Sequence, residues 1–361
     1  MINRLVIIGN GFDLAHGLKT RYEDFIDWYW INRMKGLKYE NSFVSKDSLC
    51  ILTNELNKPW SLSYSEDKDL QRKKSNKILE HLKNKPYYYK IQMSWLLSVI
   101  CQNIQAKGWV DIENDYYSCL TNAVINYKEY GKEFLADLNF DFAYLRELLI
   151  AYLEQENQRE TEFINSINEK VYKPIIKNEM PINNPDYPYN SIPDEVTPCN
   201  IMLLNFNYTN TPQLYMKNDA QISINYIHGS IENPQSIIFG YGDESDKEYS
   251  RLKEFDDSEC LHYIKQLLYQ KYGNFRKMRE FIEANPFQIC IMGHSCGTSD
   301  RTLLKLLFEH QNCLSIKPYY YKNEKGEDDY DLLIQNINRC FTNMQMMQNK
   351  VVIKEYTEPL T

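Results

Sequence analysis

The sequence predicts an α/β fold: an open parallel sheet with a large, mostly helical insertion after its first strand. Two observations predict it. At least four short aliphatic runs end in Gly, Asn or His, as buried parallel strands do where a polar turn follows them. A long stretch in which apolar side chains recur at helical spacing separates the first of these runs from the others.

The chain opens with a strand, a turn and the start of a helix. The run Leu5–Ile8 stops at Gly9-Asn10-Gly11, and a helical pattern follows. Glycines let the backbone approach a ligand, and the next helix would direct free N–H groups and its positive dipole end at an anion. Asp13 is placed to cap that helix. The turn predicts a nucleotide site or, in the plainer interpretation, a simple strand-to-helix turn.

Two familiar phosphate-binding motifs do not fit this turn. The dinucleotide fingerprint G-x-G-x-x-G requires glycine where the chain has Leu14, and no strand ending in an acidic residue follows at the expected spacing. In a Walker A loop, Lys directly follows the second glycine, whereas Leu18 follows Gly17 here. The spacing therefore disfavours a standard dehydrogenase and a P-loop NTPase.

The middle of the chain is predicted to be helical, with a charged, poorly periodic loop at 46–75. Five prolines between 181 and 198 then exclude a continuous helix and mark a domain boundary. We expect one domain from 1–20 and 195–361 and an insertion domain at 21–194. The helices are expected at 22–34, 91–104, from 109 onwards and at 135–167.

The second half alternates short strands with helices. Strands are expected at 201–204, 223–227, 236–239, 288–292, 314–321 and 351–353, and helices at 246–284, 299–310 and 329–341.

The polar residues that follow these strands are the candidate site. Parallel strands end along one edge of a sheet, and ligands of open α/β folds bind outside that edge. We therefore expect Gly9–Gly11, Asn207, His228–Gly229 and Gly293–Asp300 to converge, and we interpret the whole as a Rossmann-like nucleotide-binding domain.

Gly293-His294-Ser295-Cys296-Gly297 also matches the G-x-S-x-G pattern of a serine-hydrolase nucleophile elbow. In that fold the acid and then the histidine follow the serine. Only His310 lies downstream, on the helix that the motif itself begins, so the hydrolase interpretation is an alternative. Asp300 is expected to hold a ligand hydroxyl or to stabilise the helix start.

Composition excludes several classes of protein. The net charge of −8 disfavours a protein that coats nucleic acid. Nine cysteines without a C-x-x-C pair indicate reduced cytosolic thiols rather than disulfides or a metal site. No apolar run is long enough to span a membrane, and the first residues do not resemble a signal peptide. Asp243-Glu244 is interpreted as an acidic surface turn, and no metal site is predicted.

Taken in order, short motifs resemble the AbiH family of bacteriophage abortive-infection proteins across nearly the whole chain. The resemblance implies a cytosolic bacterial protein that limits phage spread by harming the infected cell. The motifs are Ile8-Gly-Asn-Gly-Phe-Asp-Leu-Ala-His-Gly17, Thr20-Arg-Tyr22, Trp109-Val-Asp-Ile-Glu113, Asn205-Phe-Asn-Tyr-Thr209, Ile227-His-Gly229, Phe239-Gly-Tyr-Gly-Asp243 and Gly293-His-Ser295 with Asp300.

The same order of motifs is distantly similar to sirtuin-like NAD-binding domains of defence systems. That similarity implies that Asn207 and His228 act on the nicotinamide–ribose bond. It places Gly9, Asn10, Gly11 and Asp13 near the diphosphate, and Gly293, Ser295 and Asp300 near the ribose or adenine. Two positions differ: Thr209 stands where the similar domains have Asp, and Asp13 where they have a small hydroxyl residue. The zinc-binding cysteine pairs are also missing.

We therefore expect a cytoplasmic anti-phage effector that binds a nucleotide. NAD+ is the leading candidate, and the protein would cleave its nicotinamide–ribose bond. No tightly bound cofactor is expected. His228 would be a general base, Asn207 would orient water or ribose, and Asp13 or Asp243 would stabilise an oxocarbenium ion. There are three alternatives: a non-catalytic sensor triggered by a phage or host protein, a serine hydrolase, and a nuclease. The sequence leaves open whether the protein forms a homo-oligomer.

Overall fold

The computed structural model describes residues 1–39, 43–55, 79–80, 82–84, 86–107, 111–181, 192–216 and 221–361. Its strands are β1 (Asn3–Ile8), β2 (Val44–Lys46), β3 (Cys50–Asn54), β4 (Tyr89–Met93), β5 (Ile175–Ile176), β6 (Glu195–Val196), β7 (Ile201–Asn205), β8 (Ile222–Tyr226), β9 (Phe287–Met292) and β10 (Cys313–Tyr319). Its α-helices are α1 (Asn10–Ala15), α2 (Tyr22–Tyr39), α5 (Trp95–Lys107), α6 (Ile112–Ile125), α7 (Tyr127–Asn157), α8 (Asn165–Tyr172), α9 (Lys247–Glu254), α10 (Lys265–Leu268), α11 (Asn274–Ala284), α12 (Arg301–Phe308), α13 (Tyr330–Arg339) and α14 (Met344–Lys350). Short 3-10 helices are η1 (Lys177–Glu179), η3 (Thr211–Tyr215), η4 (Pro234–Ser236), η5 (Ser258–Leu261), η6 (Tyr269–Lys271), η7 (Thr298–Asp300) and η8 (Lys354–Tyr356).

The described residues form two compact units. One comprises Met1–Leu18, Glu156–Tyr249 and Ile264–Thr361, and the other comprises Lys19–Gln155 and Ser250–Tyr263. Helices α7 and α9 cross the limits between them. Whether residues 21–194 form a domain of their own stays a prediction.

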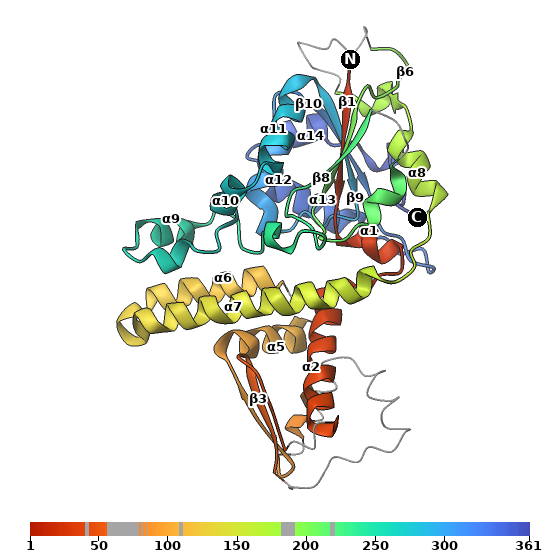
Figure 1. Ribbon diagram of the computed structural model, residues 1–361. Coiled ribbons are helices and arrows are strands. Elements are labelled where there is room, and N and C mark those ends of the chain that lie inside the picture. Colours follow the sequence, from red (N-terminus) through yellow and green to blue (C-terminus); the bar gives the residue numbers. More distant parts are fainter. Residues whose placement is uncertain are drawn as a thin grey trace. The chain divides into compact units, whose positions relative to one another are not determined.

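The first unit is built on a five-stranded parallel sheet in the order β10-β9-β1-β7-β8 (Figure 1). The chain runs from β1 outward through β7 to β8, then returns to β9 on the other side of β1 and forms β10 at the edge of the sheet. The strand order therefore reverses between β1 and β9. In open α/β sheets, ligands bind outside the carboxyl ends of the strands at such a reversal. The expected mixed α/β architecture with a parallel sheet is confirmed.

Helices cover both faces of this sheet because consecutive residues of the central strands, which point to opposite faces, are apolar. Leu5 and Ile7 of β1 point to one face and pack with residues of α11, α12, α13 and α14. Val6 and Ile8 point to the other face and pack with Phe12 and with Ile167 of α8. Figure 1 shows α11 and α12 on one side of the strands and α8 on the other. Strands buried on both faces read as continuous apolar runs, which is why the sequence marks them clearly.

A buried polar network fixes the segment around α8 and η1 to the sheet. Arg4 Nη1 donates to the carbonyl of Val171 at 2.9 Å, and Arg4 Nη2 donates to Gln288 Oε1 at 3.0 Å. Gln288 Nε2 in turn donates to Glu179 Oε2 at 2.8 Å, and Glu179 Oε1 pairs with Lys317 Nζ at 2.6 Å. Buried charges need such partners, so these contacts place residues 165–179 with the sheet.

The second unit contains α2, α5, α6 and most of α7, together with an antiparallel sheet in the order β2-β3-β4. This sheet was not expected, since the region was predicted to be helical apart from a loop. In β3 buried and partly buried residues alternate, which is the period of a strand, but the run of five residues is too short to stand out. The expected helix at 91–104 is β4 followed by α5.

Two other expected strands are corrected. Residues 237–239 have no regular structure, although Ile237, Ile238 and Phe239 are buried. They follow η4, where Pro234 occupies the first helical position, so burial rather than strand pairing explains their apolar character. Val351 makes only an isolated bridge to Ile316. Residues 56–75 of the predicted loop and Trp109 lie outside the described residues.

Candidate functional site

The glycine turn after β1 packs against the turn after β9. Gly9 N donates to Met292 O at 3.2 Å, and Gly11 N donates to Gly293 O at 2.7 Å. A Cβ atom at Gly9 would lie 2.5 Å from His294 Cα, and one at Gly11 would lie 2.9 Å from Gly293 Cα. The glycines are therefore required by neighbouring backbone, and the Gly9 and Gly11 amides are already hydrogen-bonded. Asn10 is exposed at the start of α1.

Asp13 does not cap α1, although the sequence placed it to do so. Gly9 is the N-cap, and no side chain caps the helix. Asp13 is instead 1% exposed, and its Oδ2 accepts a hydrogen bond from Thr209 Oγ1 at 2.6 Å. Its Oδ1 is buried without a hydrogen bond. Burial raises the pKa of Asp13 to about 6, against the opposing effect of polar groups on Thr209, Thr211 and Asn207.

Asn207, on the turn after β7, reaches the glycine turn directly. Its Nδ2 donates to Gly9 O at 3.0 Å, and its backbone N–H donates to Asn205 Oδ1 at 3.1 Å. The Asn207 side chain is half-buried, whereas Asn205 is buried. The structure thus joins the carboxyl ends of β1 and β7 through a residue that the sequence singled out.

His228 joins the same turn from β8. Its Nδ1 lies 3.3 Å from Phe206 O and its Nε2 lies 2.9 Å from the Tyr269 hydroxyl. A carbonyl only accepts, so these partners assign the proton to Nδ1 and make Nε2 the acceptor of the tyrosine O–H. Burial, with the nearby Lys265 ammonium, lowers the pKa of His228 to about 3. The imidazole is therefore neutral at physiological pH.

Asp300 is the centre of a buried charge cluster rather than an exposed ligand group. Its Oδ1 accepts from Lys265 Nζ at 2.7 Å and lies 3.4 Å from His228 Nε2. Its Oδ2 lies 3.7 Å from His294 Nε2. Although burial disfavours its charge, the Lys265 ammonium and the imidazoles hold the pKa of Asp300 well below its usual range. Lys265 itself is 1% exposed.

Ser295 lies at this edge of the sheet but outside these contacts. Its side chain is exposed, and its carbonyl accepts from Asn336 Nδ2 at 2.9 Å. His310 lies at the other end of β9, where its ring contacts Phe287, and its Nε2 is 3.3 Å from Glu283 Oε1. A strand of this length separates its ends by about 20 Å. His310 is therefore too far from Ser295 to act as its general base.

Asp243 is not an available carboxylate. Its two oxygens take Arg301 Nε at 3.1 Å and Arg301 Nη2 at 2.8 Å, and its side chain is 3% exposed. Such a two-point pair neutralises the carboxylate and fixes it. Of the two carboxylates that the sequence left unranked, Asp13 is the one that keeps an oxygen without a hydrogen bond.

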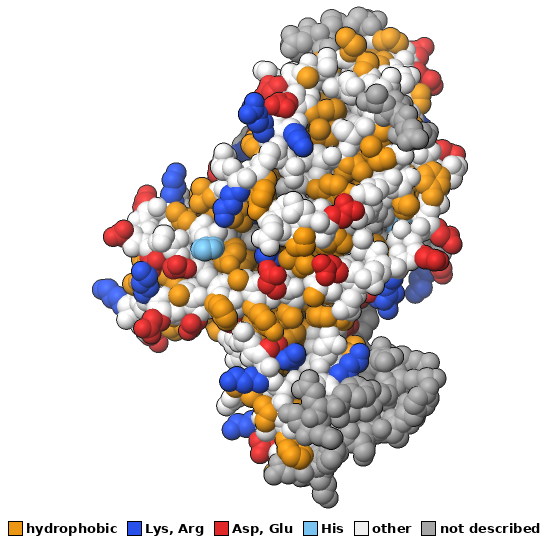
Figure 2. Space-filling model, in the orientation of Figure 1, with side chains coloured by type: hydrophobic (Ala, Val, Ile, Leu, Met, Phe, Trp, Pro, Cys, Tyr) orange, Lys and Arg blue, Asp and Glu red, His pale blue; other side chains and the backbone are white. Residues whose placement is uncertain are grey.

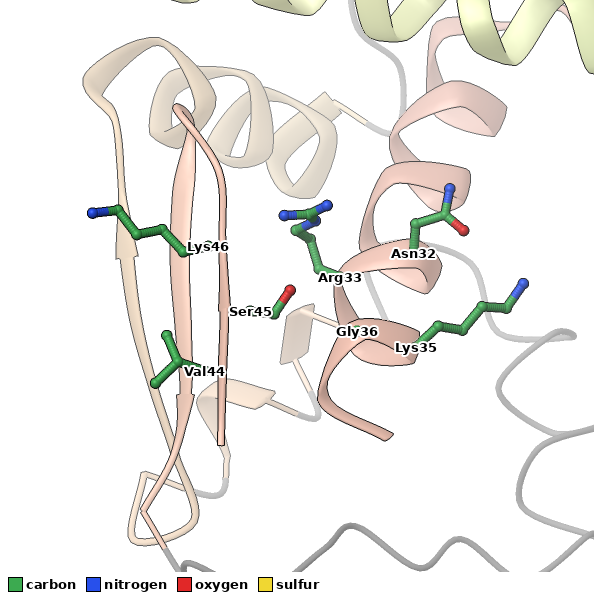
Figure 3. Close-up of a pocket in the computed structure, with 7 residues that line it drawn as sticks. All are labelled: Asn32, Arg33, Lys35, Gly36, Val44, Ser45 and Lys46. Atoms are coloured by element: carbon green, nitrogen blue, oxygen red, sulfur yellow. The ribbon is translucent and has the colours of Figure 1, made fainter. Parts of the chain in front are cut away.

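A pocket of 490 Å³ lies in the second unit, between α2 and β2. Figure 3 shows Arg33 extending between the helix and the sheet, while Lys35 points away from the sheet and Lys46 points to its other side. Arg33 is held by Asp47, with 3.1 Å between Nη1 and Oδ2. The cationic side chains around the pocket do not converge on one point, so they do not form an anion-binding site.

The face of the molecule in Figure 2 shows no large cluster of positive side chains. On the side of the molecule in Figure 2, Lys and Arg side chains are interspersed with Asp and Glu. Across the part of the chain that the structure describes, no helix combines the length and apolar character needed to cross a membrane.

Three residues of the edge were missed by the sequence interpretation. Lys265 and Tyr269 lie within the segment predicted as one helix, and nothing in their spacing connects them to His228. Thr209 was noted only as a difference from the similar sirtuin-like pattern. The signal that could have found it is the pair of differences, because Thr209 and Asp13 contact each other.

The comparisons with known proteins agree with the motifs. A family model described as bacteriophage abortive infection AbiH matches residues 5–321 of the 361-residue chain. No functionally curated protein matches the sequence. The match spans most of the chain and reaches every strand of the parallel sheet. The chain therefore belongs to the AbiH family of bacteriophage abortive infection proteins.

Proposed function

We propose that this AbiH protein is a cytoplasmic phage-defence effector whose parallel sheet forms a Rossmann-like domain, and that it binds NAD+ at the carboxyl edge and cleaves the nicotinamide–ribose bond. One observation carries the proposal. His228, which follows β8, contacts the turn that carries Asn207, since its Nδ1 lies 3.3 Å from the carbonyl of Phe206, the residue before Asn207. This turn follows β7, which is the neighbour of β1 on the side opposite to the reversal between β1 and β9.

In this proposal, Asn207 orients the ribose or the attacking water. Its half-buried amide is anchored through Nδ2 on Gly9 O, so its carbonyl oxygen is available to accept from a hydroxyl. Such positioning reduces the entropic part of the barrier.

His228 takes the proton of water or of a ribose hydroxyl, which would replace the Tyr269 hydroxyl at Nε2. Its lowered pKa keeps it neutral at the start of the reaction. Because a pKa of about 3 makes the imidazole a weak base, substrate binding would have to raise this pKa toward the operating pH. Asp300 Oδ1, 3.4 Å from Nε2, would then stabilise the imidazolium that forms.

The test is nicotinamide release from NAD+ by purified protein, with and without extracts of phage-infected cells as trigger. We expect release by the wild type and a loss of at least about 100-fold in Asn207→Ala and His228→Gln, the scale of one lost acid–base or positioning group. Asp331→Asn, an exposed residue on α13, is the control and should retain activity.

Release that persists in both variants would disprove the assigned roles. A rise in melting temperature with NAD+ but no release under any trigger would favour a non-catalytic sensor. Neither stabilisation nor release would reject NAD+ as the ligand.

A further inference from the structure

The turn after β7 is held by hydrogen bonds that begin and end on α1. Thr209 Oγ1 donates to Asp13 Oδ2 at 2.6 Å, and Asn205 Nδ2 donates to Thr209 O at 3.1 Å. Asn205 Oδ1 accepts from Asn207 N at 3.1 Å, and Asn207 Nδ2 donates to Gly9 O at 3.0 Å. Gly9 is the N-cap of α1, the helix that carries Asp13. The bonds therefore form a closed ring.

This ring determines which way the Asn207 amide faces. Its NH2 group is turned toward the protein, on Gly9 O, so its carbonyl oxygen lies on the other side of a half-buried side chain. A reversed amide would place two oxygens against each other at Gly9. The turn is anchored to an α1 side chain by the hydroxyl of Thr209 on Asp13. The side chains of Thr211 and Asn207 also interact with the Asp13 carboxylate, since they lower its pKa.

We propose that Asp13 is a positioning residue: through Thr209 it fixes the turn at 205–209 so that the Asn207 carbonyl oxygen is presented to a hydroxyl of a bound ribosyl group or of the attacking water. The inference rests on the proposed function, because it takes Asn207 as the residue that meets the ligand. Asp13 itself then contacts protein and no diphosphate, which agrees with a buried carboxylate that would repel one.

The ionised form of Asp13 is the form that holds this turn. As a carboxylate, Asp13 accepts the hydrogen bond of the Thr209 hydroxyl. A protonated Asp13 carries an O–H of its own, which competes with the Thr209 hydroxyl as a donor. Burial raises its pKa to about 6, so protonation begins just below neutrality. Tyr226 of β8 interacts with Asp13, and its raised pKa keeps it neutral. His16, the C-cap of α1, has a pKa that burial lowers.

The experiment compares Asp13→Asn, Thr209→Val and the exchange D13T/T209D in NAD+ cleavage. We expect each single variant to lower kcat about 10- to 100-fold with KM changed less than about threefold, because a misplaced group costs turnover more than binding. The exchange keeps one hydroxyl donor and one carboxylate acceptor and should recover most of kcat, which would show that turnover depends on the contact between the two side chains. Asp331→Asn, exposed on α13, is the control.

Two further readouts separate this inference from the proposed function. The wild-type kcat should fall below about pH 6, and Asp13→Asn should lack that acid limb. Independently of any activity, hydrogen exchange of the Asn207 side-chain NH2, followed by NMR, should accelerate in Thr209→Val. If the wild type neither binds nor cleaves NAD+, the proposed function fails. The hydrogen-exchange rate of the Asn207 side chain then tests the role of Asp13 by itself. An unchanged Asn207 exchange rate in folded Thr209→Val would overturn the inference.

Discussion

The backbone N–H of Gly11 donates to the carbonyl of Gly293 at 2.7 Å, and so joins the turn after β1 to the turn after β9. These two strands are neighbours in the sheet although about 280 residues separate their turns in the chain. Gly293 has a φ of +73°, and a Cβ atom there would lie 2.1 Å from Phe12 N. The contact fixes the position of α1 and hence of Asp13.

Gly293→Ala is predicted to destabilise the protein severely, by more than about 3 kcal/mol, because strain at positive φ adds to a backbone clash. Gly326→Ala separates the two effects. Gly326 also has positive φ (+86°), but a Cβ atom there would meet no other atom within 4 Å, so this variant should lose only about 1 kcal/mol. Urea unfolding of both variants measures the difference. Equal losses would show that strain alone matters at Gly293.

Asp13→Asn should change how stability depends on pH. Burial raises the pKa of Asp13 to about 6 in the folded protein from its ordinary value of 3.8, so between these values the folded state binds more protons than the unfolded state. Stability due to Asp13 is therefore greatest below pH 4 and falls as pH rises through 6. The wild type should lose about 2.4 kcal/mol relative to Asp13→Asn between pH 4 and pH 7.

The measurement is the unfolding free energy of both proteins at several pH values, taken as a difference so that other groups cancel. A difference that stays constant from pH 4 to pH 7 would show that Asp13 titrates normally.

The sequence predicted the edge of the sheet because parallel strands all end on one side. Asn207 and His228 could be placed there from their strands alone. The roles of individual atoms could not be predicted. The Gly11 amide is taken by Gly293, and the Asp13 carboxylate by Thr209, and both partners come from distant parts of the chain. Lys265 lies on a short helix outside the strands, so no strand-end rule could bring it to Asp300.

Ser295 should not react with an organophosphonate probe. A hydrolase serine needs a base in hydrogen-bond reach, and His310 lies at the opposite end of β9. Mass spectrometry of the protein after incubation with a fluorophosphonate should find Ser295 unmodified, with a serine hydrolase as the positive control for the reagent. Stoichiometric labelling at Ser295 that Ser295→Ala abolishes would restore the hydrolase alternative.

Lys265→Met should raise the pKa of His228 and destabilise the fold. The Lys265 ammonium opposes a positive charge on His228, so its removal favours the imidazolium beside Asp300. The same change leaves Asp300 without the cation 2.7 Å away, and breaking a buried ion pair from one side costs about 3–5 kcal/mol. NMR titration of the His228 ring, assigned with His228→Gln, measures the pKa, and urea unfolding measures the stability.

The double variant Lys265→Met/Asp300→Leu distinguishes pairing from packing. It removes both charges, so it should be more stable than Lys265→Met alone, as double-mutant cycles of contacting charges show when the pair is coupled. Lys271→Met is the matched control, because Lys271 is an exposed lysine close by in the chain and should change neither the His228 pKa nor the stability. A His228 pKa that is the same in Lys265→Met and in the wild type would contradict the proposed coupling, because it would show that burial alone keeps the imidazole neutral.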